Sequence, residues 1–186
     1  MTHYYKIFII KFIILLWFSN LAKAEEFNTL FGMKLLDNIE EYFESSVINN
    51  IKYKNPETID NYFDVDVTDL INKKSPQIDF YTITIDNKNT IHSIYGEKEL
   101  DNIENCTERV VPSIVEIFNR KYSLEFEYYE GSYTDFNIYS FYSYDNIGNP
   151  LRIQCNEGID GYIYIQIVYQ TLLLLEEVDR FYDSGF

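Results

Sequence analysis

Residues 78–95 read IDFYTITIDNKNTIHSIY, two apolar-rich runs separated by a polar stretch at residues 86–89. Side chains alternate along the first run, with Tyr81, Ile83 and Ile85 on one face and Phe80, Thr82 and Thr84 on the other. A period of two is typical of a strand with one buried face, and a short polar stretch between two such runs indicates a turn. We therefore predict a β-hairpin over residues 78–95.

Similar alternation extends outward from this hairpin in both directions. We predict further strands at residues 31–35, 62–67, 124–130, 136–144, 150–156 and 161–170. In the strand at 150–156, Cys155 lies on the same face as Leu151 and Ile153, whereas Arg152 and Gln154 lie on the opposite face. Turns are expected at residues 146–150 and 156–161, which contain the glycine and proline that favour them.

Three helices are predicted between and after these strands. Asp37 and Glu40 have the spacing of a capping box, so a short helix is expected at about 38–45, followed by a loop at 46–61. The strongest helical pattern covers residues 98–121, where Pro112 predicts a kink or two abutting helices. Thr171 is expected to cap a C-terminal helix.

This order of elements predicts an α+β fold. We expect one or more antiparallel sheets of about six to seven strands, packed by the central kinked helix and the C-terminal helix. Residues 25–186 contain no stretch that looks like a linker, so they are expected to form a single domain.

The first 24 residues resemble a secretory signal peptide in composition. A charged start and a short apolar run lead to Ala22-Lys23-Ala24, after which Glu25 follows directly. The alternative is an uncleaved membrane anchor, but a span needs about 20 consecutive apolar residues and this run is shorter. We predict cleavage between Ala24 and Glu25, and export of residues 25–186 to the periplasm or the extracellular space, without membrane attachment.

The two cysteines, Cys106 and Cys155, both lie outside the predicted signal peptide. In an oxidising compartment the simplest expectation for such a pair is one disulfide. A helix lying on the sheet would bring them together, because Cys155 shares a face with aliphatic residues and Cys106 lies at the edge of the apolar stripe of the predicted helix. Two free thiols or a metal pair are the alternatives, and the scarcity of histidine makes the metal pair weak.

Charge and composition disfavour several functions. The chain has 15 basic and 30 acidic residues, a net charge of −15, which would repel nucleic acid. His92 is the one histidine after the predicted cleavage point and lies within a strand, so histidine-based catalysis is not expected. No motif indicates a cofactor or a metal site.

Tyrosine is the most unusual remaining feature, with 18 in the chain. Tyr162 and Tyr164 lie opposite the isoleucine row of the last strand, and Asp64 and Asp66 lie opposite the apolar side chains of the strand at 62–67. We treat these four residues as a candidate binding surface, because exposed tyrosine offers apolar area together with a hydroxyl. The alternative is that tyrosine is simply a strong strand former, in a composition typical of AT-rich genomes.

Two segments also resemble known sequences. LFGMKLLDNIEEYF at residues 30–43 and ITIDNKNTIHSIYG at residues 83–96, together with Cys106, resemble uncharacterised small exported bacterial proteins from AT-rich genomes. The resemblance implies an exported α+β domain. It implies no activity, cofactor or catalytic residue.

From these features we expect an exported, non-catalytic binding or accessory domain for another protein or a small ligand. An acidic inhibitor of a cationic protein is the sharper form of this hypothesis. The alternative is a carboxylate-dependent hydrolase of envelope glycans, which would need two acidic groups held close together. A structural subunit of a larger envelope assembly is the third hypothesis.

Overall fold

The computed structural model describes residues 25–53, 61–72, 74–133 and 135–183. Within these ranges an eight-stranded antiparallel sheet dominates the fold, with the strand order β3-β4-β5-β6-β10-β9-β8-β7. Its strands are β3 (Lys52–Tyr53), β4 (Tyr62–Asp66), β5 (Phe80–Asp86), β6 (Ile91–Leu100), β7 (Glu127–Ser132), β8 (Phe136–Tyr144), β9 (Pro150–Gly158) and β10 (Ile163–Gln170). The predicted signal peptide, residues 1–24, lies outside the described residues.

The remaining elements flank this sheet. They are the small hairpin of β1 (Thr29–Leu30) and β2 (Met33–Lys34), the 3₁₀-helix η1 (Ile39–Glu41), α2 (Ser45–Ile51), α3 (Ile103–Asn105), the π-helix η2 (Cys106–Val110), α4 (Val111–Tyr122) and α5 (Leu172–Asp183). The α+β class, the antiparallel sheet and its helices are confirmed, with one or two strands more than expected.

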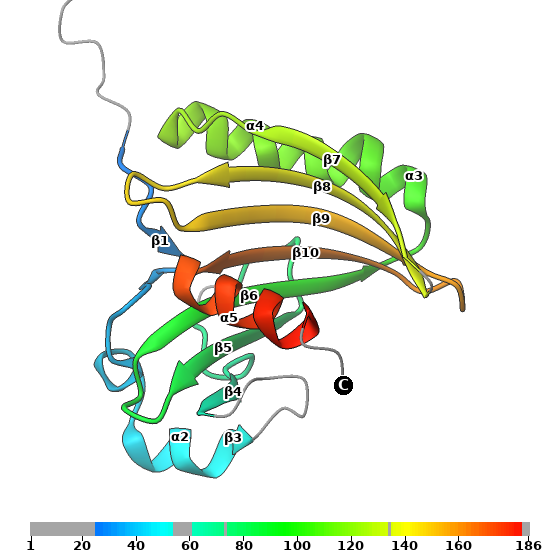
Figure 1. Ribbon diagram of the computed structural model, residues 1–186. Helices are drawn as coiled ribbons and strands as arrows, with labels where there is room; N and C mark the ends of the chain where they lie inside the picture. Colours follow the sequence, from blue (N-terminus) through cyan, green and yellow to red (C-terminus); the bar gives the residue numbers. More distant parts are fainter. Residues whose placement is uncertain (1–24, 54–60, 73, 134, 184–186) are drawn as a thin grey trace, which may run out of the picture.

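The sheet has a different cover on each face. Figure 1 shows α4 at the back of the β7–β9 region and α5 in front of β10 and β6. On the α4 face, Ile153 and Ile165 are fully buried, and Phe27 from the N-terminal segment packs against Phe118 of α4 and Tyr169 of β10. The main hydrophobic core therefore lies between the sheet, α4 and the N-terminal segment. We call the opposite side of the sheet the α5 face.

The predicted hairpin at residues 78–95 is confirmed as β5 and β6. Its turn is held by Asp86, whose Oδ1 accepts hydrogen bonds from the backbone N–H groups of Lys88 (2.8 Å) and Thr90 (2.9 Å). Strand β6 runs further than expected, because it pairs with β10 as far as Leu100, opposite Ile163. The prediction that a helix begins at residue 98 is therefore wrong, and the first helical residue is Ile103.

The interruption expected at Pro112 takes the form of a π-helical segment. Proline lacks a backbone N–H, and its ring excludes the α-helical position of the carbonyl four residues before it. The chain adopts the wider π turn at Cys106–Val110 and places Pro112 in the first turn of α4. Cys106 is thereby held over β9, where it forms the predicted disulfide with Cys155, with a Cα–Cα distance of 5.9 Å.

The N-terminal predictions need correction. The strand expected at 31–35 is a hairpin, with Phe31 and Gly32 at positive φ in its two-residue turn. The helix expected at 38–45 is reduced to η1, whose N-cap is Asn38, while Asp37 instead accepts a hydrogen bond from the Tyr42 hydroxyl at 2.6 Å. Helix α2 occupies the first part of the expected loop at 46–61, because packing of Ile48 in the core outweighs the weak propensity of its two asparagines.

Gly96 allows the small N-terminal hairpin to dock on the sheet. A Cβ atom at this position would lie 2.7 Å from Cζ of Phe31, whose ring also packs against Tyr81 at 4.8 Å between centroids. We expect Gly96→Ala to lower the free energy of unfolding by about 1–3 kcal/mol, because the ring must move. Denaturant unfolding measures this loss. In a Phe31→Leu background the loss should shrink, and an undiminished loss would contradict the docking argument.

Candidate functional site

The register of the sheet aligns polar side chains in rows across the α5 face. One row contains Glu97 on β6, Gln166 on β10, Gln154 on β9, Ser140 on β8 and Tyr129 on β7. The adjacent row on one side contains Tyr95, Val168, Arg152 and Tyr142, and the row on the other side contains Glu99, Tyr164, Asn156 and Ile138. This face therefore combines amides, tyrosines and one guanidinium group.

Hydrogen bonds link the middle of these rows into a network. Gln166 donates through Nε2 to the Tyr95 hydroxyl (2.7 Å) and to Glu97 (3.2 Å), and the Tyr95 hydroxyl itself donates to Glu97. Gln154 donates through Nε2 to Gln166 Oε1 (2.8 Å) and to Asn156 Oδ1 (3.0 Å). Burial and the Glu97 carboxylate raise the pKa of Tyr95, so this hydroxyl remains a neutral donor.

The network leaves several buried polar atoms unsatisfied. Ser140 Oγ, Arg152 Nε, Gln154 Oε1 and Asn156 Nδ2 have no hydrogen-bond partner in the described part of the chain. Ser140, Asn156 and Gln154 are 0%, 2% and 4% exposed. A buried polar atom without a partner costs about 1–3 kcal/mol, so four of them at neighbouring positions of β8 and β9 call for an explanation. We call these four residues the polar floor.

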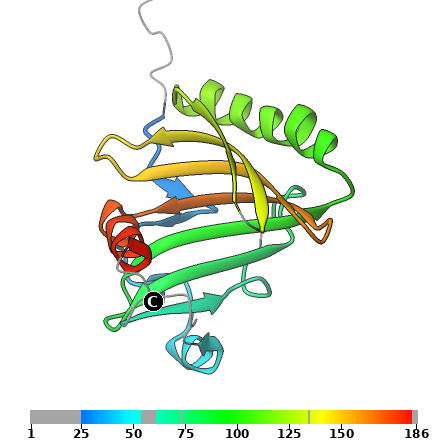
Figure 2. The ribbon, with the colours of Figure 1, turned by 45° about the vertical axis from the view of Figure 1, so that its right-hand side comes forward.

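A cleft adjoins the polar floor at Arg152. Its volume is about 310 Å³, and it is lined by Tyr133, Tyr142, Pro150, Arg152, Val168, Gln170, Leu175 and Asp179. The last two belong to α5, and Tyr133 follows β7, whose hairpin with β8 bends across the front of the sheet in Figure 2. We call this space the α5 cleft. Its size falls at the lower end of the range for small-molecule sites.

Tyr133 and Tyr142 line the rim of the α5 cleft, and Tyr129 lies beside them. Tyr129 and Tyr142 meet edge to face at 6.3 Å between ring centroids. The ring of Tyr129 lies over Gly131, where a Cβ atom would be 2.8 Å from it. A hydrogen bond with Tyr129 and burial raise the pKa of Tyr133, which Arg152 partly offsets. The rings of these tyrosines and the guanidinium group of Arg152 are therefore close neighbours.

Three of the four residues of the predicted binding surface lie on the α5 face, but the four do not form one site. Tyr164 lies in the row of Asn156, directly beside the polar network, and Tyr162 is an exposed residue just before β10. Asp64 and Asp66 lie on β4, separated from β10 by β5 and β6. Asp64 is buried and accepts a hydrogen bond from the Thr84 hydroxyl at 2.7 Å, whereas Asp66 is exposed.

The polar floor and the α5 cleft were not identified from the sequence. Alternation did place Arg152 and Gln154 opposite the aliphatic face of their strand, which was the available signal. It could not show that Ser140 and Asn156 would be buried with them, because that depends on which strands are neighbours and on the path of β7.

His92 connects the β5–β6 hairpin to α5. It is 6% exposed, with Nε2 3.4 Å from Asp86 Oδ2 and Nδ1 3.3 Å from the Thr171 hydroxyl. The Thr171 hydroxyl also accepts the backbone N–H of Leu174, which confirms the predicted helix cap. The Thr171 hydroxyl, the His92 imidazole and the Asp86 carboxylate thus lie in a row of polar contacts. Neither His92 nor Thr171 belongs to the lining of the described cavities. We interpret the arrangement as an anchor for α5.

Tyr62 provides a second anchor for α5 and a pH-dependent prediction. Burial, followed by a hydrogen bond to Glu177 of α5, raises the pKa of Tyr62 from 10.0 to about 12. A raised folded-state pKa stabilises the fold below the unfolded-state value and is lost as pH rises through the folded-state value. We therefore expect stability to fall between about pH 10 and 12.

Thermal unfolding across this pH range, with tyrosinate absorbance recorded in parallel, measures the effect. Glu177→Gln should lower the pKa of Tyr62 toward its ordinary value. Glu176→Gln, the same change at the exposed neighbouring position, is the control. Identical titrations of the two variants would contradict this role of Glu177.

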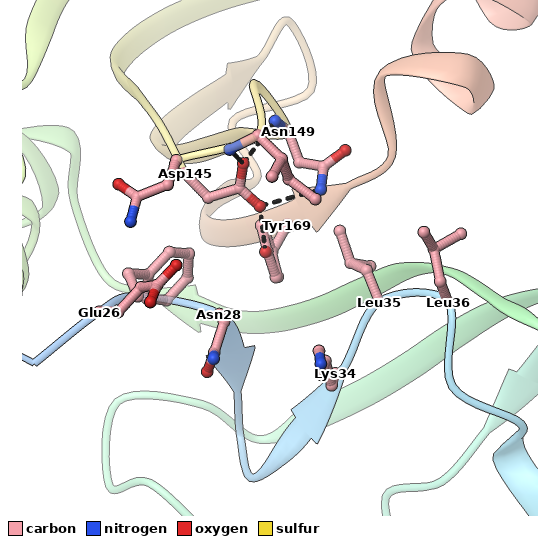
Figure 3. Close-up of a pocket in the computed structure, with 11 residues that line it drawn as sticks. Glu26, Asn28, Lys34, Leu35, Leu36, Asp145, Asn149 and Tyr169 are labelled. Atoms are coloured by element: carbon pink, nitrogen blue, oxygen red, sulfur yellow. Dashed lines mark hydrogen bonds between the residues drawn. The ribbon is translucent and has the colours of Figure 1, made fainter.

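A second cavity, shown in Figure 3, has a structural explanation. It measures about 190 Å³ and lies between the N-terminal segment and the β8–β9 turn. Asp145 accepts hydrogen bonds from the backbone of Ile147 (2.9 Å) and Asn149 (2.8 Å), from the Asn149 side chain (2.9 Å) and from the Tyr169 hydroxyl (2.6 Å). Because its carboxylate is fully used in holding the turn, we do not treat this cavity as a binding site.

Among the described residues, no group of three or more His, Cys, Asp or Glu side chains is arranged to hold a metal ion. In the same part of the chain, no helix has both the length and the apolar character needed to cross a membrane. No protein-family model matches the chain, and comparison with curated proteins finds no match either.

Proposed function

We propose that this protein is an exported, non-catalytic binding domain that takes a small polar ligand in the α5 cleft. Export is supported by the signal-like composition of residues 1–24 and by the Cys106–Cys155 disulfide, which is typical of oxidising compartments. The resemblance to exported bacterial proteins agrees with this location.

The polar floor is the observation on which the proposal rests. Its unpartnered atoms include donors, on Arg152 and Asn156, and an acceptor, on Gln154. A ligand in the α5 cleft would pair with Arg152 directly and, through ordered water, with Gln154 and Asn156, which lie further along β9 and do not line the cleft. The tyrosines at the rim and the apolar side chains of Val168 and Leu175 supply the remaining contacts expected of a small-molecule site.

The other hypotheses have less support. A cationic protein remains a predicted partner because of the net charge of −15, and acidic residues such as Asp66 and Glu99 are exposed on the α5 face. However, the unsatisfied atoms are buried, and the one on Arg152 belongs to a residue that lines the α5 cleft, where a small ligand reaches it more readily than a protein surface does. Hydrolysis of glycans needs two carboxyl groups, and among the described residues Asp179 is the single carboxyl residue that lines the α5 cleft.

Side-chain NMR signals test this proposal. In ¹H–¹⁵N spectra of the purified protein, Arg152 Nε–H and the amide groups of Gln154 and Asn156 give separate peaks. A fragment library should contain compounds that shift these peaks together while leaving the Asn119 amide, exposed on α4, unchanged. Failure of every fragment to shift any of the three peaks would contradict a binding site here.

A further inference from the structure

The charged side chains of the α5 cleft indicate which class of ligand it accepts. Arg152 and Asp179 come from opposite sides of it, one from β9 and the other from α5. Neither has an ion-pair partner among the described residues. In a chain with twice as many acidic as basic residues, a half-buried arginine without a carboxylate partner is unusual.

The guanidinium group favours a carboxylate over a phosphate. Its planar set of donors matches a carboxylate in two parallel hydrogen bonds, and Nε of Arg152 is one of the unpartnered donors. A phosphate would bring more negative charge, and no second lysine or arginine of the described ranges lines the α5 cleft. The acidic surroundings would repel an anion unless the ligand also had a positive charge.

Asp179 and the aromatic rim can accept that positive charge. A carboxylate pairs with an ammonium group, and the faces of Tyr133 and Tyr142 attract cations. Pro150, Val168 and Leu175 add an apolar wall that an uncharged side chain could contact. A cleft of about 310 Å³ suits one compact molecule rather than an oligomer.

We propose that the α5 cleft binds a free α-amino acid, with its carboxylate on Arg152 and its ammonium group toward Asp179. This inference rests on the proposed function, since it specifies the ligand of the same cleft. An apolar side chain on the amino acid would contact Val168 and Leu175. The rings of Tyr133 and Tyr142 would then lie against the bound amino acid at the edge of the cleft.

Isothermal titration of the purified protein with leucine and phenylalanine tests the inference. Each is compared with its N-acetyl derivative, which lacks the ammonium charge, and with its amide, which lacks the carboxylate. Glucose serves as an uncharged polar probe. Each masked derivative should bind about tenfold or more weakly than the free amino acid, as expected for loss of a charge-assisted hydrogen bond.

Matched variants test which side chain binds each of the two charged groups of the amino acid. Arg152→Gln should weaken binding of the free amino acids about tenfold or more. Arg152→Lys should weaken it less, because lysine keeps the positive charge but lacks the two parallel donors of the guanidinium group. Asp179→Asn should weaken binding of the free amino acids but not of their N-acetyl derivatives. Glu176→Gln, which removes the same charge from the same helix outside the cleft, should change nothing.

The outcomes separate this inference from the proposed function. Equal affinities for free and N-acetylated amino acids, or no effect of Asp179→Asn, would overturn the amino-acid assignment. Binding of glucose alone would overturn it while leaving a ligand site in the α5 cleft. Failure of these probes and of the whole fragment library would overturn both. Circular dichroism melting of each variant shows whether it is folded.

Discussion

Replacing Cys106 and Cys155 together with alanine is expected to lower the free energy of unfolding by about 4 kcal/mol. The disulfide joins residues 49 positions apart, so in the unfolded chain it closes a long loop and removes much conformational freedom. Both cysteines are fully buried, and the loss of packing adds to the effect. A loss of this size is a large fraction of the total stability of a typical domain, which is about 5–15 kcal/mol.

Denaturant unfolding of the double variant against the oxidised wild type measures this loss. Reducing the wild type with dithiothreitol is the matched control, because it breaks the bond without removing either side chain. Reduction should lower the free energy of unfolding by the same amount as the double substitution, apart from the packing energy that truncation to alanine removes. A difference below about 1 kcal/mol between oxidised and reduced wild type would show that the disulfide contributes little to stability.

Asp145→Ala is the substitution outside the disulfide with the largest expected effect on stability. It removes the acceptor of four hydrogen bonds, so the buried hydroxyl of Tyr169 and Nδ2 of Asn149 lose the carboxylate to which they donate. We expect a loss of about 3–5 kcal/mol, since breaking buried charge-assisted contacts leaves their donors unsatisfied. The same carboxylate, after burial, raises the pKa of Tyr169.

Two comparisons keep this prediction specific. Asn146→Ala changes the neighbouring exposed residue of the same turn and should cost less than about 0.5 kcal/mol. Asp145→Asn keeps one acceptor oxygen and should cost less than Asp145→Ala. Equal effects of Asp145→Ala and Asn146→Ala on denaturant unfolding would contradict the role given to the carboxylate.

Strand alternation in the sequence predicted much of the sheet. Strand β8 has the expected bounds, and β5, β9 and β10 differ by a few residues at their ends. The predictions failed where long-range pairing or packing decides the outcome. Residues 98–100 continue β6 because β10 extends to meet them, and α2 forms because Ile48 is buried in the core. Neither effect is visible in a local pattern.

The candidate site was predictable only in part. Alternation placed Tyr164, Arg152 and Gln154 on faces opposite the core, and all three lie on the α5 face. The α5 cleft itself depends on the strand order, which puts β8 beside β9, and on the position of Asp179 at the other wall. These arise from contacts across the whole chain, so Ser140, Asn156 and Asp179 had no distinguishing local signal.

A high-resolution crystal structure of the protein soaked with leucine would show whether the α5 cleft binds an amino acid. Electron density for the amino acid is expected in the α5 cleft, with a carboxylate oxygen within hydrogen-bond distance of Arg152 Nε. Gln154 Oε1 and Asn156 Nδ2 should then be bonded to the ligand or to waters that the ligand orders. A cleft that contains water alone, or an Arg152 turned to pair with an acidic side chain of its own chain, would contradict it.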